Sequence, residues 1–345
     1  MRILITADPE LPVPPVLYGG IERIVGALVK GLRSRGHIVA LAANRQSTCE
    51  VDALFGWPGA RSQGRLDVVR NTAALLAAAR TFRPDVLHSF SRALYLLPLL
   101  PFRLPKIMSY QRHPGARQVA WAARLSRGSL TFTGCSEHIC LCGRPSGGAW
   151  HAIHNCVELD KYTYRPAVAA DAPLVFLSRV ERIKGAHTAI QIARRSGRRL
   201  LIAGNHGNHG NSGHEGRYWD EEVVPHLGRD GIEYVGAVDD RQKNDLLGGA
   251  AAMVVPIEWD EPFGIVFAEA LACGTPVISC PRGALPEIVR HGVDGFLVGG
   301  VDEGVRAVAD LPKISRAACR ERAEACFSAD VVVAQYESLY RSLLR

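Results

Sequence analysis

Several sequence signals are missing from this chain, and each absence excludes a class of protein. No uncharged apolar run reaches the roughly eighteen residues that a membrane-spanning helix needs. Neither G-x-G-x-x-G nor G-x-x-x-x-G-K-[ST] occurs, which argues against a dinucleotide fingerprint and a P-loop. No D-x-D is present either, since the adjacent Asp239 and Asp240 do not form that motif, so a diphosphate held by a metal ion is not predicted.

The cysteines and the first residues predict a cytoplasmic protein. Nine cysteines is an odd number, and the opening MRILITADPE is a short strand-like run without the layout of a signal peptide. The thiols are therefore expected to be reduced, as they are in a cytosol.

The net charge of +7 is distributed unevenly. Residues 1–165 contain 21 Lys and Arg against 10 Asp and Glu, whereas residues 166–345 contain 20 against 24. A basic half is typical of proteins that meet an anionic membrane, a phosphorylated acceptor or nucleic acid, and solvated surface arginine explains it equally well. Arg117, Trp121 and Arg124 share one face of a predicted helix, which suits peripheral contact with an anionic membrane or a solvated face. No RNP-type aromatic motif occurs, so we expect no nucleic-acid partner.

Strand-like and helix-like segments alternate along both halves of the chain. In the first half, helical or polar segments follow the runs RILITA, HIVALAA, DVLHSF, KIMSY and SLTFTGCS. The pattern begins again near Leu174 with PLVFLSR, RLLIAG, EYVGAV, AAMVVPI and TPVISC. Such alternation predicts α/β architecture with parallel sheets wrapped by helices. Residues 156–173, which are rich in Pro and Ala, are interpreted as a linker.

This pattern predicts two doubly wound, Rossmann-like domains that face each other across a cleft. The first covers residues 1–160 and the second 161–325, and a helix over 326–345 is expected to cross back to the first domain. Ligands of such sheets bind beyond the carboxyl ends of the strands.

Two carboxylates, Glu261 and Glu269, stand in the otherwise apolar and small run EPFGIVFAEALACGTPVIS. Burying a lone carboxylate is costly, so both are expected to have a bound partner. The P-F-G turn predicts a helix start at which the N–H groups of Phe263, Gly264 and Ile265 suit phosphate or sugar oxygens. Carboxylates accept the hydrogen bonds that sugar and ribose hydroxyls donate. The segment therefore fits a ligand with a phosphate between two polyols.

Two cations precede a second helix, in FLSRVERIKGAHTAI. Arg179 and Lys184 follow a strand, and such a pair can neutralise a diphosphate and stabilise a departing nucleotide. An ordinary surface pair is the alternative.

Together these segments resemble the retaining family-four glycosyltransferases, which have the GT-B fold and an E-x7-E signature. The likeness runs from Arg2 to the final helix. It implies that Glu261 acts at the donor sugar, Glu269 at the nucleotide ribose, and Arg179 and Lys184 at the diphosphate. It also implies that backbone atoms hold the rest of the donor, at the base and the sugar: those of Val238, Phe263, Gly264 and Ile265.

The first half carries the acceptor-side candidates. Gly19 and Gly20 directly precede a predicted helix, where the backbone can approach a phosphate, although a Gly-Gly pair alone is weak. With Glu22 they match the GGxE that such enzymes commonly carry. Many relatives have a catalytic His after the strand that corresponds to KIMSY. That position falls on Gln111, and the nearest histidine is His113, which we prefer slightly.

Two groups of potential metal ligands are interpreted as structural. Cys135, His138, Cys140 and Cys142 are crowded, but C-x4-C-x-C is not a familiar zinc spacing, so the cysteines are predicted to be small buried hydrophobes. The glycine-rich, histidine-containing residues 204–216 are predicted to form a mobile loop. We expect no metal site and no cofactor beyond the nucleotide-sugar co-substrate.

The sequence thus predicts a retaining glycosyltransferase of the hexosyl type. Its donor would be a nucleotide diphosphate sugar, with a UDP-sugar placed first, and its acceptor a glycan, a lipid-linked molecule or a small molecule. The alternatives are a nucleotide-sugar epimerase or sugar phosphorylase on the same scaffold, and an inactive sugar-nucleotide-binding module.

Overall fold

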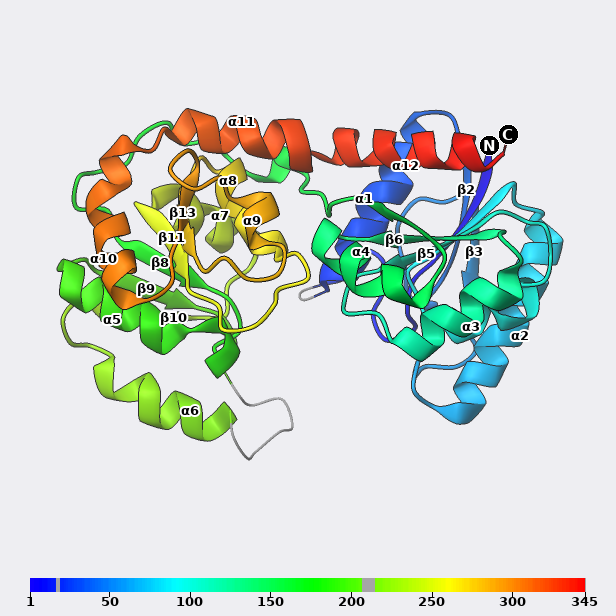
Figure 1. The fold of residues 1–345 in the computed structure, drawn as a ribbon, viewed down its shortest axis with the longest axis horizontal. Coiled ribbons are helices and arrows are strands. Elements are labelled where there is room, and N and C mark those ends of the chain that lie inside the picture. Colours follow the sequence, from blue (N-terminus) through cyan, green and yellow to red (C-terminus); the bar gives the residue numbers. More distant parts are fainter. Residues whose placement is uncertain (17–18, 207–214, 345) are drawn as a thin grey trace. The chain divides into compact units, whose positions relative to one another are not determined.

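The chain forms two compact units (Figure 1). A computed structural model describes residues 1–16, 19–206 and 215–344, so most of the predicted loop at 204–216 lies outside the described residues. Unit 1 comprises Met1–Cys156 and the C-terminal helix, and unit 2 comprises Val157–Ser328. The units divide after residues 156 and 328, whereas the sequence predicted domain boundaries after residues 160 and 325. The chain enters and leaves unit 2 side by side, because the Val157 N–H donates to the Phe327 carbonyl at 2.7 Å.

Unit 1 contains a seven-stranded sheet in the order β3-β2-β1-β4-β5-β6-β7, with every pairing parallel. Its strands are β1 (Arg2–Thr6), β2 (Ile38–Ala43), β3 (Ala53–Gly56), β4 (Val86–Ser89), β5 (Lys106–Tyr110), β6 (Leu130–Gly134) and β7 (Ala149–Ala152). The edge strands β3 and β7 were not predicted. Both are short and largely solvent-accessible, so they lack the apolar run that marks the buried strands.

Helices surround this sheet, and the last helix of the chain completes the unit. They are α1 (Gly20–Ser34), α2 (Arg65–Phe82), η1 (Ala93–Leu99), α3 (Ala116–Ser126), α4 (Glu137–Gly143), η2 (Arg144–Ser146) and α12 (Ala329–Leu343). Figure 1 shows α12 beside α1. The two helices approach closely, because a Cβ on Gly31 of α1 would lie 2.6 Å from Val333 of α12.

Unit 2 contains a six-stranded parallel sheet in the order β10-β9-β8-β11-β12-β13. The strands are β8 (Leu174–Leu177), β9 (Leu200–Ala203), β10 (Ile232–Gly236), β11 (Ala252–Val255), β12 (Val277–Ser279) and β13 (Gly295–Leu297). Both sheets reverse strand order beside their first strand, which is the doubly wound arrangement of Rossmann-like domains. The predicted α/β fold class is confirmed.

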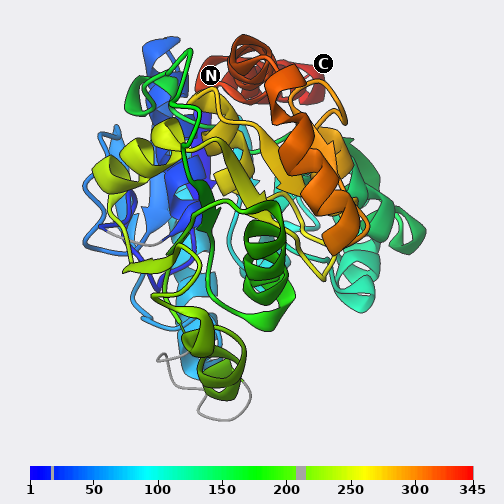
Figure 2. The same ribbon diagram turned by 90° about the vertical axis from the view of Figure 1, so that its left-hand side faces the viewer.

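Helices cover both faces of the second sheet. They are η3 (Leu159–Lys161), η4 (Arg182–Lys184), α5 (Ala186–Ser196), α6 (Glu215–Glu222), η5 (Val224–His226), α7 (Asp240–Gly249), α8 (Ile265–Ala272), α9 (Leu285–Ile288), α10 (Val301–Asp310), η6 (Leu311–Lys313) and α11 (Arg316–Phe327). Helices α5 and α10 pack side by side, as Figures 1 and 2 show, while α8 packs on α7 and α11. No helix within the described residues is both long enough and apolar enough to cross a membrane.

The stretch interpreted as a linker is packed on unit 2. Tyr162 is buried, and the Arg165 N–H donates to the Cys273 carbonyl at 3.1 Å. The buried Arg316 side chain of α11 donates to the Arg165 carbonyl at 2.7 Å. These bonds give an irregular segment a fixed position, although Pro, Ala and the lack of periodicity suggested a flexible connection.

A buried histidine joins the first sheet to α12. His88 of β4 has no exposed surface, and its Nδ1 and Nε2 lie 2.6 Å from the Tyr340 hydroxyl and the Ser109 hydroxyl. Its ring also contacts Tyr336 of α12, at a centroid distance of 4.8 Å. Burial lowers the pKa of His88 to about 3, because the charged imidazolium would lose its hydration.

We expect this histidine to make unfolding strongly pH-dependent. The unfolded side chain titrates near pH ~6.5, so its contribution to stability is complete above that pH and is lost as pH falls toward 3. Between pH 6 and 4 the wild type should lose about 1.4 kcal/mol per pH unit more than His88→Asn. Urea unfolding across this range measures the difference.

His151→Asn, which changes an exposed histidine in the same unit, is the matched control and should keep the wild-type slope. Equal slopes for the wild type and His88→Asn would show that His88 is not held neutral in the folded chain.

Candidate active site

Two tight turns in unit 2 place the charged residues. Gly185, just after η4, has φ 78°, and a Cβ there would lie 2.1 Å from the Pro256 carbonyl oxygen after β11. Gly283, after β12, has φ 57°, and a Cβ there would lie 2.3 Å from the Glu261 carbonyl oxygen. Only glycine permits both the positive φ and the close approach. These contacts hold the loops that carry Lys184 and Glu261 at the carboxyl end of β11.

Lys184 and Glu261 form a buried ion pair. The distance from Lys184 Nζ to Glu261 Oε2 is 2.5 Å, and their side chains are only 9% and 11% exposed. Trp259 Nε1 donates to the same carboxylate oxygen at 2.9 Å, and its ring centroid lies 4.7 Å from Lys184 Nζ. The structure therefore brings together two residues predicted separately, and Trp259, which the sequence did not single out, orients both.

Glu269 has a second cation as its partner. Its Oε1 accepts hydrogen bonds from the Tyr162 hydroxyl at 2.5 Å and from Lys243 Nζ at 2.7 Å. The side chain of Glu269 is 8% exposed, and that of Lys243 is 13% exposed. Neither partner was predicted. Tyr162 lies in the stretch interpreted as a linker, and Lys243 lies on the polar helix α7, so neither has a local sequence signal.

Helix α8 (Ile265–Ala272) follows Glu261 and contains Glu269. It begins at Ile265 with Gly264 as N-cap, so the first N–H groups of the helix have no carbonyl partner within it. The Phe263 ring is buried and packs on Phe327 at a centroid distance of 5.7 Å. The Phe263 ring is therefore part of the core, and its predicted backbone contact with a ligand stays a prediction.

Arg179 and Val238 are more accessible than the buried Lys184, Glu261 and Glu269. Arg179 follows β8, its side chain is 48% exposed, and its guanidinium pairs with Glu181. Val238 is half-buried and follows β10. Arg179 is thus the most exposed cation of the predicted donor residues.

Four side-chain atoms in the described part of unit 1 are buried without a hydrogen-bond partner, and two of these, besides His37 Nε2 and Tyr110 Oη, lie just beyond the carboxyl ends of strands. These two are Gln111 Nε2, directly after β5, and Asp8 Oδ1, shortly after β1. The carboxyl ends of parallel strands share one edge, and α1 starts at Gly20, after Gly19, at the edge where β1 ends. Burial, and secondarily Glu10, raises the pKa of Asp8 to about 6. Asp8 was not predicted, since a single acid after a strand is common.

His113 lies in a different environment from Gln111. It is exposed, and its ring stands perpendicular to that of His138 at a centroid distance of 5.4 Å. The prediction that the nearby cysteines are buried holds for Cys135 and Cys140 and is wrong for Cys142, which is exposed. Helix α4 has one face in the core and one in solvent, and the spacing of the cysteines places them on both.

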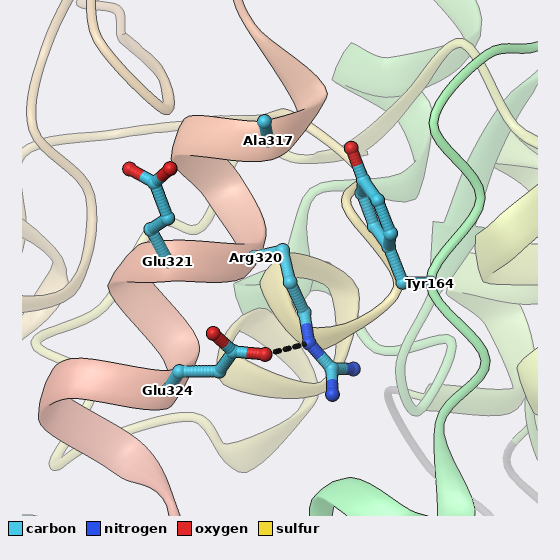
Figure 3. A pocket seen from close by; sticks show the side chains of 5 residues that line it. All are labelled: Tyr164, Ala317, Arg320, Glu321 and Glu324. Carbon is cyan, nitrogen blue, oxygen red and sulfur yellow. Dashed lines mark hydrogen bonds and ion pairs between the residues drawn. The ribbon is translucent and has the colours of Figure 1, made fainter.

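A separate pocket lies beside α11 (Figure 3). It has a volume of about 330 Å³ and is lined by Tyr164, Ala317, Arg320, Glu321 and Glu324. Arg320 Nε donates to Glu324 at 2.6 Å, and Arg320 also donates to the Tyr162 carbonyl. None of the predicted site residues lines this hollow, so we do not assign it to the candidate active site.

Both halves of the chain match glycosyltransferase families. Residues 18–144 match Glycosyltransferase Family 4, and residues 168–325 match Glycosyl transferases group 1. The chain is 26% identical to the glycogen synthase of Mycobacterium tuberculosis over 390 residues, covering 94% of this chain and 89% of that protein.

Two solved structures are similar over almost the whole chain. AviGT4, a glycosyltransferase involved in avilamycin A biosynthesis, is 26% identical with a TM-score of 0.73, covering 99% of this chain and 98% of that one. HepE of Anabaena, in complex with UDP and glucose, is 18% identical with a TM-score of 0.74, covering 99% and 100%.

The Lys184–Glu261 pair should be more important for stability than its neighbouring ion pair. Lys184→Met keeps the apolar stem but leaves a buried carboxylate without its cation, so the free energy of unfolding should fall by about 3 kcal/mol. Urea or guanidinium unfolding of the ligand-free protein measures this change.

Arg182→Met is the matched control. It removes an ion pair to Glu222 whose side chains are 57% and 40% exposed, and should cost less than about 1 kcal/mol. Equal losses in the two variants would contradict the buried pairing.

Proposed function

Because the chain belongs to the family-four glycosyltransferases of the GT-B fold, we propose that it transfers a hexosyl group with retention of anomeric configuration. The donor is a nucleotide diphosphate sugar. The bond from the anomeric carbon to the diphosphate oxygen breaks with its electron pair staying on the diphosphate. An acceptor hydroxyl oxygen bonds to the same face of the sugar, and the hydroxyl proton passes to the departing diphosphate. We place this reaction in the cytoplasm and give it no metal cofactor.

The observation that carries the proposal is the pairing of each buried carboxylate around α8 with a lysine. Lys184 pairs with Glu261, which precedes α8, and Lys243 pairs with Glu269, which lies on α8. The first N–H groups of this helix suit an anion. We assign the diphosphate to Arg179 and Lys184, and the sugar to Glu261 and the backbone of residues 263–265. Glu269 receives the ribose, and the backbone at Val238 receives the base.

Diphosphate binding then supplies the catalytic effect. Cations near the departing diphosphate stabilise the charge that develops there, and fixed positioning of donor and acceptor lowers the entropic cost. UDP is the first nucleotide to test, since HepE, which shares the fold, was solved in complex with UDP and glucose.

The acceptor side falls to unit 1. Buried polar atoms without partners cost free energy unless a ligand satisfies them, and Asp8 Oδ1 and Gln111 Nε2 are such atoms. An acceptor hydroxyl can donate to Asp8, and Gln111 can donate to an oxygen of the donor or acceptor. On this ground we place Gln111 ahead of His113 near the reacting carbon. The proposed acceptor is a glycan, a lipid-linked molecule or a small molecule. A lipid-linked acceptor would bring the protein into peripheral contact with a membrane.

The donor assignment is tested by binding and by product analysis. UDP, GDP and ADP should raise the unfolding temperature unequally, because a nucleotide bound to the folded state stabilises it. With the preferred nucleotide sugar and an acceptor panel, nuclear magnetic resonance should detect a new glycoside with the anomeric configuration of the donor. A free epimer, a sugar phosphate or an inverted glycoside would overturn the proposal.

Two isosteric variants test the assigned roles. Glu269→Gln should weaken the binding of the nucleoside diphosphate by about tenfold to a hundredfold, because the ribose loses a charged hydrogen-bond acceptor. Glu261→Gln, the matched control, should weaken it less and reduce turnover instead. The reverse order would reject the division between ribose and sugar.

The two acceptor-side candidates can be separated by kinetics. Gln111→Ala should lower kcat/KM by about a hundredfold, as the loss of a buried hydrogen-bond donor at a reacting centre does. His113→Ala should change it by less than about threefold, because its side chain is exposed. The kcat/KM of both variants is measured in a buffer that contains a metal chelator. A larger effect at His113 would restore the histidine to the catalytic position.

A further inference from the structure

Three side chains of metal-ligand type converge in unit 1. They are His113, in the segment between β5 and α3, and His138 and Cys142, both on α4. The ligand atoms of the three residues all lie within 4.8 Å of one another. Sequence spacing did not reveal this group, because His113 is distant from α4 in sequence and C-x4-C-x-C is not a familiar zinc spacing.

The distance between the two ligand atoms on α4 is close to the distance between two ligands of one bound metal ion. Residues four apart on a helix lie on the same face, and His138 Nε2 is 3.9 Å from Cys142 Sγ. With bond lengths of about 2.0–2.1 Å to nitrogen and about 2.3 Å to sulfur, a tetrahedral ion separates two such ligand atoms by about 3.6 Å. A small side-chain rotation therefore suffices for both to bind one ion.

The framework that presents these ligands is well fixed. Ser136 caps α4, its hydroxyl accepting from the Ile139 N–H at 3.2 Å, and Ile139 and Cys140 anchor the inner face in the core. Cys140 thus points away from the solvent-facing ligands. Glu137 is engaged by the Arg144 guanidinium, so it does not compete for the ion.

We propose that His113, His138 and Cys142 bind a divalent ion of the zinc class. Two imidazoles and a thiolate select Zn²⁺ or Co²⁺ over Mg²⁺ or Ca²⁺, which prefer oxygen ligands. Three protein ligands leave a fourth position for water. The ion ties the segment after β5 to α4, and its binding releases the thiol proton of Cys142. The site lies wholly within unit 1 and does not depend on the proposed sugar transfer.

Cobalt titration of the metal-free full chain tests this site. One equivalent of Co²⁺ should produce the strong visible absorption of a tetrahedral complex and a thiolate-to-cobalt charge-transfer band, and Zn²⁺ should displace both. Cys142→Ser should abolish the charge-transfer band, and His138→Ala should weaken Co²⁺ binding by about tenfold or more, as lost coordination support does. Zn²⁺ should raise the unfolding temperature of the wild type but not that of Cys142→Ser.

Matched variants exclude other sources of binding. Cys49→Ser and His151→Ala replace residues of the same types elsewhere in unit 1 and should leave the spectrum unchanged. A variant with alanine at His206, His209 and His214 removes the histidines of the glycine-rich stretch and should bind Co²⁺ as the wild type does. All variants are first shown to unfold like the wild type without metal.

Two results would overturn the proposal. One is a weak, octahedral cobalt spectrum without charge transfer. The other is binding that survives Cys142→Ser and disappears in the variant that lacks the three histidines.

Discussion

The candidate site depends on one electrostatic constraint: a carboxylate removed from water needs a cation or several hydrogen-bond donors. The segment around α8 places two carboxylates, Glu261 and Glu269, in surroundings where little of either side chain is exposed. Each is satisfied by a lysine and by one aromatic donor, Trp259 Nε1 or the Tyr162 hydroxyl. These ion pairs and hydrogen bonds hold four separate loops and helices around α8. A purely apolar core would not need such contacts.

This pairing also bears on how an anion would bind. Without ligand, Lys184 is neutralised by Glu261 and Arg179 pairs with Glu181, so neither cation presents an uncompensated charge. A diphosphate must therefore compete with carboxylates for these cations. A sugar makes that exchange favourable, because its hydroxyls can donate to a carboxylate that has given up its lysine. A nucleotide sugar supplies both parts of the exchange, whereas inorganic diphosphate supplies only one.

The sequence predicts the fold better than it predicts the partners within the site. Buried strands such as β1 and β8 are continuous apolar runs followed by helices, so the architecture can be inferred locally. The P-F-G turn likewise marks the start of α8. Lys243 and Tyr162 have no such pattern, because their importance arises only when α7 and an irregular segment pack beside Glu269. The exposed edge strand β7 was missed because it lacks an apolar run.

The two units differ in how their buried polar groups are satisfied. M. tuberculosis glycogen synthase and AviGT4 are each 26% identical to this chain, yet one is named for glycogen synthesis and the other takes part in avilamycin A biosynthesis. Overall similarity therefore does not identify the acceptor. In unit 2 the buried charges are paired within the protein. In unit 1, by contrast, Asp8 Oδ1 and Gln111 Nε2 are buried without partners at the carboxyl edge of the sheet. Such atoms cost free energy unless a partner satisfies them, so this edge of unit 1 is where a polar ligand would be most stabilising.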